Sequence, residues 1–144
     1  MTGEDATAWS LARLNTAFFH HYGRRDYEAV LDLFAPDALY ELRGRSLRGR
    51  AEIKQVLDAR PGPEQTIRHL VTNQHFHTID GTTAQGTITL IAYGAPTPTG
   101  SGPGRYPTAT AGHVVEVTDH YRADDGHWKI AHRTANEVLT PASD

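Results

Sequence analysis

The C-terminal part of the chain alternates apolar and polar residues on both sides of an Asp-Gly pair, and this pattern constrains the fold most. From Val114 to Arg122 the odd positions are apolar apart from Asp119. Successive side chains of a strand point to opposite faces, so Asp119 is expected on the buried face. Asp125-Gly126 is a strong signal for a two-residue hairpin turn. A return strand from His127 to about Asn136 completes the predicted β-hairpin.

The register of this hairpin places Asp119 opposite His132. A slip of one residue would set Tyr121 against Lys129, so the apolar pattern selects the register. Directly opposed residues have Cβ atoms roughly 4.5–5.5 Å apart. A carboxylate beside an imidazole orients the ring and raises its basicity, as general acid–base catalysis requires. The pair is interpreted either as catalytic or as a structural hydrogen-bonded pair at the end of the sheet.

The preceding sequence predicts helices first and strands afterwards. Apolar residues recur at helical spacing in three segments, and each segment ends at a Gly or a Pro. The predicted helices cover about residues 7–22, 27–35 and 50–59, with a short strand at 38–42. The basic stretch at 43–50 is interpreted as a solvated loop and helix start, or alternatively as an anion site. Long strands are predicted at 66–79 and 83–93, joined by a turn at Asp80-Gly81. This order indicates the α+β class, with the helices packed on one face of a curved antiparallel sheet.

Several polar residues are expected on otherwise apolar surfaces. Pairing across Asp80-Gly81 places His69 opposite Ala92 and Asn73 opposite Ile88. His69 and Asn73 are interpreted either as ligand-facing residues or as residues hydrogen-bonded to the backbone. Three tyrosines also have two interpretations, because each can present its hydroxyl to a pocket or pack in the core. They are Tyr22, Tyr40 and Tyr93.

The composition argues against several classes of protein. The chain has 144 residues and a net charge of −3 with interspersed signs, which fits a single domain over 1–144 and argues against nucleic-acid binding. It has no cysteine and no apolar run of membrane-spanning length, so we expect a cytoplasmic protein without a membrane partner. His75 and His77 share a strand face but have no third ligand at a recognisable spacing, so neither a metal nor another cofactor is predicted.

A segment rich in Pro, Gly and Thr separates the two predicted hairpins. It covers residues 94–112 and is long for a hairpin connection, so we expect a mobile lid. Arg105 and Tyr106 belong to its only bulky cluster, and one of them is expected to fold toward a pocket mouth. Tyr106 is therefore a candidate substrate-binding residue, together with Trp128 on the inward face of the last hairpin.

The order of elements, together with six short motifs, resembles the SnoaL-like group of the nuclear transport factor 2-like superfamily, which includes scytalone dehydratase and bile-acid dehydratase. The resemblance covers about residues 11–138, the greater part of a core at about 7–138. The motifs are Tyr22 with Arg25-Asp26-Tyr27-Glu28-Ala29-Val30, Phe34-Ala35-Pro36-Asp37-Ala38, Leu47-Arg48-Gly49-Arg50-Ala51-Glu52-Ile53, Arg68-His69-Leu70-Val71-Thr72-Asn73, Asp119-His120-Tyr121, and Asp125-Gly126-His127-Trp128-Lys129-Ile130. They indicate a fold more than a reaction, because this fold hosts many reactions.

The resemblance implies a cystatin-like cone, in which three N-terminal helices pack on a strongly curved, mainly antiparallel sheet that encloses an apolar pocket. It further implies a homodimer and a small hydrophobic ligand. His69 matches the strand histidine that acts as acid or base in the similar dehydratases, and Tyr22 matches their helix tyrosine. Those enzymes usually place an aspartate directly after the tyrosine, whereas this chain has Gly23. Asp119 is the candidate for the missing carboxylate.

Two functions are compatible with these observations. The first is a cofactor-independent enzyme of the dehydratase, isomerase or cyclase type, acting on a ring-bearing hydrophobic metabolite, as in natural-product biosynthesis. His69, Asp119 and His132 would handle protons, and tyrosine hydroxyls with Asn73 would orient the substrate. The second is a ligand-binding or accessory domain with the same pocket and no turnover, which Gly23 favours.

Overall fold

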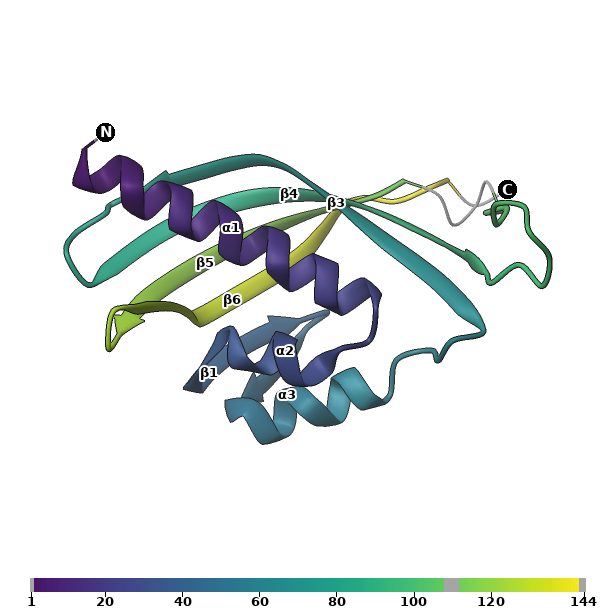
Figure 1. Cartoon of the computed structure of the whole chain (residues 1–144), viewed down its shortest axis with the longest axis horizontal. Coiled ribbons are helices and arrows are strands. Elements are labelled where there is room, and N and C mark those ends of the chain that lie inside the picture. Colours follow the sequence, from purple (N-terminus) through teal and green to yellow (C-terminus); the bar gives the residue numbers. More distant parts are fainter. Residues whose placement is uncertain (1, 108–111, 143–144) are drawn as a thin grey trace.

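Six strands form one curved sheet, and three helices pack against its inner side (Figure 1). The computed structural model describes residues 2–107 and 112–142. In chain order the elements are α1 (Gly3–Gly23), α2 (Tyr27–Asp32), β1 (Phe34–Leu42), β2 (Arg45–Arg48), α3 (Gly49–Asp58), β3 (Gln65–His77), β4 (Thr83–Pro96), β5 (His113–Asp124) and β6 (His127–Leu139). The predicted α+β class is confirmed, with the three helices before the long strands.

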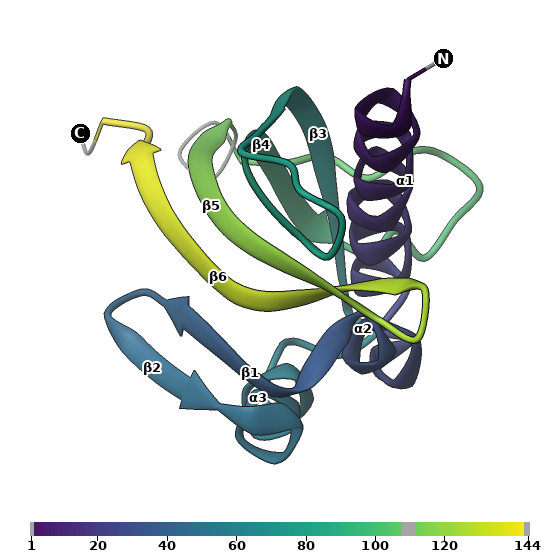
Figure 2. The ribbon, with the colours of Figure 1, turned by 90° about the vertical axis from the view of Figure 1, so that its left-hand side faces the viewer.

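The sheet is mainly antiparallel and strongly curved, as expected for the cone. Its strand order is β2-β1-β6-β5-β4-β3. Only β1 and β6 run parallel among these neighbours. Figure 2 shows how far β5 and β6 bend, so that the sheet wraps around the space beside α1. This curvature creates an interior between the sheet and the helices.

Capping residues fix the starts of the first two helices. Thr2 and Asp5 form a capping box, in which the Asp5 amide donates to the Thr2 hydroxyl at 3.0 Å and the Thr2 amide donates to the Asp5 carboxylate at 2.9 Å. α1 therefore begins several residues before the predicted start. The Asp26 carboxylate accepts from the Ala29 amide at 3.3 Å, which confirms its predicted capping role at α2.

The segment between β1 and α3 contains a strand that the sequence did not predict. β2 pairs with β1 across a turn at Arg43 and Gly44, whose φ angles of 50° and 75° lie in the left-handed region. Both central residues of a tight hairpin turn need such angles. The expected solvated loop was therefore wrong at Arg45–Arg48, where β2 forms, whereas the helix start expected at the end of this stretch is confirmed by α3.

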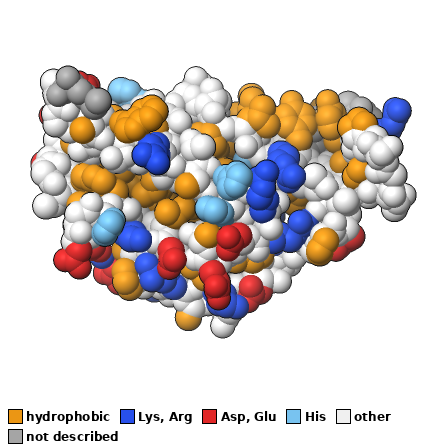
Figure 3. Space-filling model, in the orientation of Figure 1, with side chains coloured by type: hydrophobic (Ala, Val, Ile, Leu, Met, Phe, Trp, Pro, Cys, Tyr) orange, Lys and Arg blue, Asp and Glu red, His pale blue; other side chains and the backbone are white. Residues whose placement is uncertain are grey.

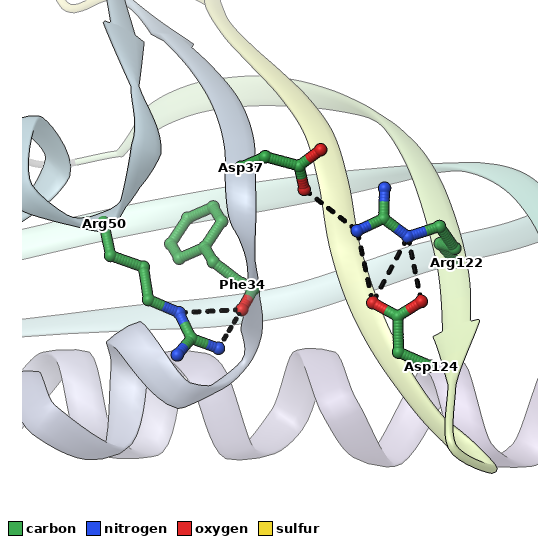
Figure 4. Close-up of polar contacts among 5 residues, drawn as sticks. All are labelled: Phe34, Asp37, Arg50, Arg122 and Asp124. Carbon is green, nitrogen blue, oxygen red and sulfur yellow. Dashed lines mark hydrogen bonds and ion pairs between the residues drawn. The ribbon is translucent and has the colours of Figure 1, made fainter.

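Two arginines attach β1 to its surroundings (Figure 4). Arg50, on α3, donates from Nε to the Phe34 carbonyl oxygen at 3.1 Å. Arg122, on β5, donates from Nη2 to Asp37 at 2.9 Å and from Nε to Asp124 at 3.0 Å. β1 is thus tied to α3 on one side and to the last hairpin on the other.

A β-bulge changes the predicted register of the last hairpin. Tyr121 pairs with Ile130 as expected, but the next pair is His120 with His132, which leaves Ala131 unpaired. An extra residue on one strand reverses the alternation of faces beyond it. Asp119 therefore lies opposite Arg133 instead of His132. The predicted Asp119–His132 pair was wrong for this reason.

A second bulge changes the register of the β3–β4 hairpin. His69 pairs with Ala92 and Val71 with Leu90, as predicted, but the register shifts between Thr72 and His75. Asn73 lies in this shift with a φ of 48°, and it is exposed. The predicted pairing of Asn73 with Ile88 was therefore wrong.

The helices and the inner sheet face share one apolar core. Its fully buried members include Leu11, Phe18, Val30, Phe34, Ile53, Ile88, Val117 and Ile130. On the face shown in Figure 3, acidic and basic side chains are interspersed over α2 and α3. Within residues 2–107 and 112–142, no helix is long and apolar enough to cross a membrane.

Candidate functional site

A cavity of about 710 Å³ lies between the helices and the inner sheet face. Four predicted site residues contribute to its wall, from α1, β1, β3 and β4. They are Tyr22, Tyr40, His69 and Tyr93. Most of the other lining residues are apolar, including Phe19, Leu42, Val56, Ile67, Leu90, Ala92, Val115, Val117 and Ala135. A cavity of this size and character is typical of a small-molecule site.

His69 lies between two aromatic side chains of α1. Its ring centroid is 5.2 Å from that of Phe19 and 5.2 Å from that of Tyr22. Its Nδ1 is buried and has no hydrogen-bond partner among the described residues. Burial, together with the positive charge of Arg60, lowers the pKa of His69 to about 4. The imidazole is therefore neutral at pH 7 and able to accept a proton.

Arg60 follows α3 and covers the ring of Tyr22. Its guanidinium carbon lies 3.6 Å from the centroid of that ring, a cation–π contact. Its Nη1 donates to the Tyr22 carbonyl oxygen at 3.0 Å and to the Tyr27 hydroxyl at 2.8 Å. Burial raises the pKa of Tyr22, although the charge of Arg60 opposes the shift, and burial also raises the pKa of Tyr40. Both phenols therefore stay protonated at neutral pH.

Asp119 belongs to a fully buried network behind the cavity wall. Arg133 donates from Nε to one Asp119 oxygen at 2.8 Å and from Nη2 to the other at 2.8 Å, and Tyr121 donates its hydroxyl at 2.6 Å. The Asn15 amide donates to the Tyr121 hydroxyl at 2.9 Å and accepts from Arg133. Although burial opposes the charge of Arg133, the Asp119 carboxylate outweighs it and raises the pKa of the guanidinium. Neither member of the ion pair lines the cavity.

His132 lies on the opposite side of the sheet from the buried Asp119. Its Nε2 is 2.8 Å from a carboxylate oxygen of Glu41, and its ring stacks on His120 at a centroid distance of 5.9 Å. The same Glu41 oxygen accepts from the Thr134 hydroxyl at 3.0 Å. The bulge at Ala131 turns His132 to this outer face, away from the cavity.

The remaining predicted ligand-binding residues lie outside the cavity wall. Asn73 is exposed at its bulge, and Trp128 packs at the edge of the core. Tyr106 has 56% of its surface exposed and its ring contacts that of Tyr93 at a tilt of 53°, with ring centroids 5.1 Å apart. Residues 94–96 of the predicted lid belong to β4, and 97–107 contain no helix or strand. The other part of the lid, at 108–111, lies outside the described residues.

Sequence reasoning missed the other ionisable residues of the cavity wall, apart from the basic stretch that contains Arg43. They are Arg43, Arg60, His113 and Glu137, and a neutral amide, Asn136, lies beside them. His113 and Glu137 face each other at 3.7 Å. Only one local signal was available. Ala135 is apolar, yet strict alternation would place it on the opposite face from Ile130, which indicates a bulge between them. No sequence pattern around Arg60 indicated a role in the cavity, because its position there depends on how α1, α3 and β3 pack together.

Gly23 ends α1 at a point where the backbone of the helix lies close to the backbone of β3. A Cβ at this position would lie 3.2 Å from the Ile67 carbonyl oxygen, so a side chain here would need a shift of β3. Glu137 is the one carboxylate among the described lining residues, and it faces His113. Asp119 does not supply the carboxylate missing at position 23, because it is bound to Arg133. His69 therefore has no carboxylate partner in the described cavity wall.

These features coincide with a match to a known family. Residues 6–134 match the SnoaL-like domain, and the chain belongs to that family. No curated protein matches the sequence. Solved structures match it over most of their length, which confirms the nuclear transport factor 2-like fold.

Three of the similar structures carry names that refer to elimination reactions. A candidate scytalone dehydratase from Novosphingobium aromaticivorans has a TM-score of 0.79 at 17% identity, covering 98% of this chain and 91% of the other. A candidate dehydratase of the NTF2-like family from Streptomyces avermitilis has a TM-score of 0.75 at 22% identity, with coverage of 94% and 99%. A type 2 hexachlorocyclohexane dehydrochlorinase has a TM-score of 0.75 at 14% identity, with coverage of 97% and 91%. The TM-scores establish the shared fold. At identities this low, the reaction has to be inferred from the residues of the site.

Proposed function

We propose that this protein is a cofactor-independent enzyme that removes a proton from a small hydrophobic, ring-bearing substrate, with His69 as the general base. The observation that carries the proposal is the neutral imidazole of His69, which sits in a mostly apolar cavity with its Nδ1 unpaired within the described chain. Buried polar groups are usually satisfied, and groups with strongly shifted pKa values cluster at functional sites. The names of the similar structures agree with elimination chemistry.

The proposed reaction begins with transfer of a carbon-bound proton to His69. The electron pair of the C–H bond forms a new C=C bond, and a leaving group on the adjacent carbon departs with its own electron pair. In a dehydratase the leaving group is hydroxide, and the imidazolium of His69 returns the proton to it as water. In an isomerase no group leaves: the C–H electron pair moves into an enolate, and the imidazolium of His69 returns a proton, which exchanges with solvent, to another carbon. Tyr22 and Tyr40 are protonated and would donate hydrogen bonds to a substrate carbonyl oxygen, where negative charge develops.

A non-catalytic binding domain is the second candidate function. Gly23 favours it, because none of the described lining residues places a carboxylate beside His69 to stabilise its imidazolium form. In that case the cavity would bind the same class of ligand and His69 would only line it.

The two functions are separated by incubating the protein with a metabolite extract in D₂O and following masses by mass spectrometry. We expect a dehydratase to produce ions that have lost one water, and an isomerase to produce ions that have gained deuterium without other change. His69→Asn should lower either signal by roughly 10²–10⁴-fold, the usual contribution of general acid–base catalysis. His127→Asn is the matched control, because His127 is exposed beside the β5–β6 turn.

Equal signals from the wild type and His69→Asn would exclude His69 as the base. Ligand that is retained by the wild type without any change of mass would support the binding domain instead. Asp119→Asn should leave the signal per folded molecule unchanged, because Asp119 lies outside the cavity.

A further inference from the structure

The ionisable groups of the cavity wall differ in whether they have a partner of opposite charge. His113 and Glu137 face each other at 3.7 Å. Arg60 lines the cavity and has no carboxylate within ion-pair distance among the described residues. Arg43 also reaches the wall, but it is exposed on the β1–β2 turn. The guanidinium groups of Arg43 and Arg60 outnumber the one carboxylate of the described wall, that of Glu137, so the wall carries an excess of positive charge.

Arg60 is held in place and still has donors to offer. The Tyr22 ring lies against its guanidinium, and Nη1 alone makes its two hydrogen bonds, to the Tyr22 carbonyl and the Tyr27 hydroxyl. Nε and Nη2 make none within the described chain. An arginine fixed by stacking and by one nitrogen loses little side-chain freedom when its other donors bind a ligand.

Arg60 and His69 lie in the same part of the cavity, beside Tyr22. Both contact the Tyr22 ring, with the Arg60 guanidinium carbon 3.6 Å and the His69 ring 5.2 Å from its centroid. A ligand that reaches His69 is therefore close to the guanidinium. A forked guanidinium pairs bidentately with a planar group that bears two oxygens, and it also donates charge-assisted hydrogen bonds to a single charged oxygen.

We propose that Arg60 is the specificity-determining residue of the cavity and selects hydrophobic ligands that carry an oxyanion, either a carboxylate or the enolate of an acidic ketone. This inference rests on the proposed function for the role of His69 beside the ligand, and it adds the class of substrate. An anion bound by Arg60 would also neutralise the charge that opposes protonation of His69, so that the correct ligand would make the base stronger.

The experiment measures binding of two matched pairs of probes by isothermal titration calorimetry. Each pair has one aromatic body with and without the negative charge: 2-naphthylacetate against 2-naphthylacetamide, and 2-hydroxy-1,4-naphthoquinone, ionised at pH 7.5, against its 2-methoxy ether. We expect one of the anions to bind roughly tenfold to a hundredfold more tightly than its neutral partner, the range for a hydrogen bond to a charged group. The first pair identifies a carboxylate site and the second an enolate site.

Arg60→Met should abolish the preference while the neutral probe keeps its affinity. Arg60→Lys should restore only part of it, because an ammonium keeps the charge and loses the fork. Arg13→Met is the matched control, since Arg13 is exposed on α1 and does not line the cavity. Thermal melts check that each variant is folded, and the comparison of probes on the wild type needs no variant at all.

Equal affinities of the charged and neutral members of both pairs would overturn the anion preference, as would failure of all four probes to bind at millimolar concentration. A preference that survives in Arg60→Met would assign the selection to another residue and overturn the role of Arg60. These outcomes are independent of the deuterium and mass signals, so the anion preference can fail while the proton-transfer function stands.

Discussion

The Asp119–Arg133 network and the His69 cavity both place polar groups inside the protein, but they differ in how those groups are satisfied. Both oxygens of Asp119 accept hydrogen bonds, and among the described residues Arg133 lacks a partner only for Nη1. Its guanidinium carbon lies 4.5 Å from the centroid of the Phe18 ring. His69 lies beside a cavity, with its Nδ1 unpaired in the described part of the chain. The first arrangement is closed by the protein itself, and the second is open to a ligand.

The difference teaches that burial of a polar residue is a poor guide to its function unless its partners are known. Asp119 was singled out because a carboxylate on an apolar strand face is unusual. Its partners show that the ion pair fastens β5, β6 and α1 together through Asn15. Breaking the closed network should therefore change stability, whereas changing the open site should change function.

The largest expected effect comes from removing one partner of the buried ion pair. Arg133→Met leaves the Asp119 carboxylate buried without its counter-ion, which should lower the free energy of unfolding by about 3–5 kcal/mol. Urea denaturation followed by tryptophan fluorescence measures this change. Arg122→Met is the matched control, because Arg122 pairs with exposed carboxylates and should cost less than about 1 kcal/mol. Equal effects of the two variants would contradict the distinction between the regions.

A dependence on pH of up to about 3 kcal/mol should identify the open site, since one pKa unit corresponds to about 1.4 kcal/mol. The pKa of His69 is about 4 in the folded protein, against 6.5 ordinarily. Between these values the unfolded chain binds more protons, so the free energy of unfolding should fall as the pH is lowered from about 6.5 to about 4. His69→Asn should flatten this part of the profile in denaturation series at successive pH values. A profile unchanged in that variant would show that other groups cause the dependence.

A smaller effect is expected inside the closed network. Tyr121→Phe removes the hydroxyl that donates to Asp119 at 2.6 Å and accepts from Asn15 at 2.9 Å. The loss should be about 1–3 kcal/mol, because the Asn15 amide is left buried without an acceptor. Thermal unfolding measures it, and turnover per folded molecule should not change. A fall in turnover at constant stability would place Tyr121 in the site after all.

The smallest expected effect concerns the segment that follows β4. Tyr106 contacts the ring of Tyr93 at the cavity wall while most of its own surface is exposed. Tyr106→Ala should weaken ligand affinity a few-fold and change the free energy of unfolding by less than about 0.5 kcal/mol, as for most surface substitutions. Calorimetry with the better-binding naphthalene probe measures the first quantity. Unchanged affinity would reduce this segment to a connection between strands.

Local patterns predicted the elements of this fold well, because periodicity and turn signals act over a few residues. The turn at Asp125-Gly126 and the pairing of Tyr121 with Ile130 were predicted correctly. The errors began at the bulge, where one extra residue reversed the faces of β6. As a result Arg133, and not His132, lies opposite Asp119. The placement of His69 in the cavity wall held because its stretch of β3 precedes the second bulge. Arg60 could not be found locally, because its contacts depend on how α3 meets α1.

The parallel pairing of β1 with β6 also determines when the protein can fold. β1 lies next to α2 in the sequence, yet its main neighbour is the last strand of the sheet. Loops this long close slowly, so we expect folding on the slower, millisecond-to-second side for a domain of this size. During synthesis, the helices and the β1–β2 hairpin would emerge with one long edge of β1 unpaired until β6 leaves the ribosome. The partly synthesised chain is therefore most prone to aggregation before β6 emerges. A chaperone that covers the unpaired edge of β1 would have its largest effect at that stage.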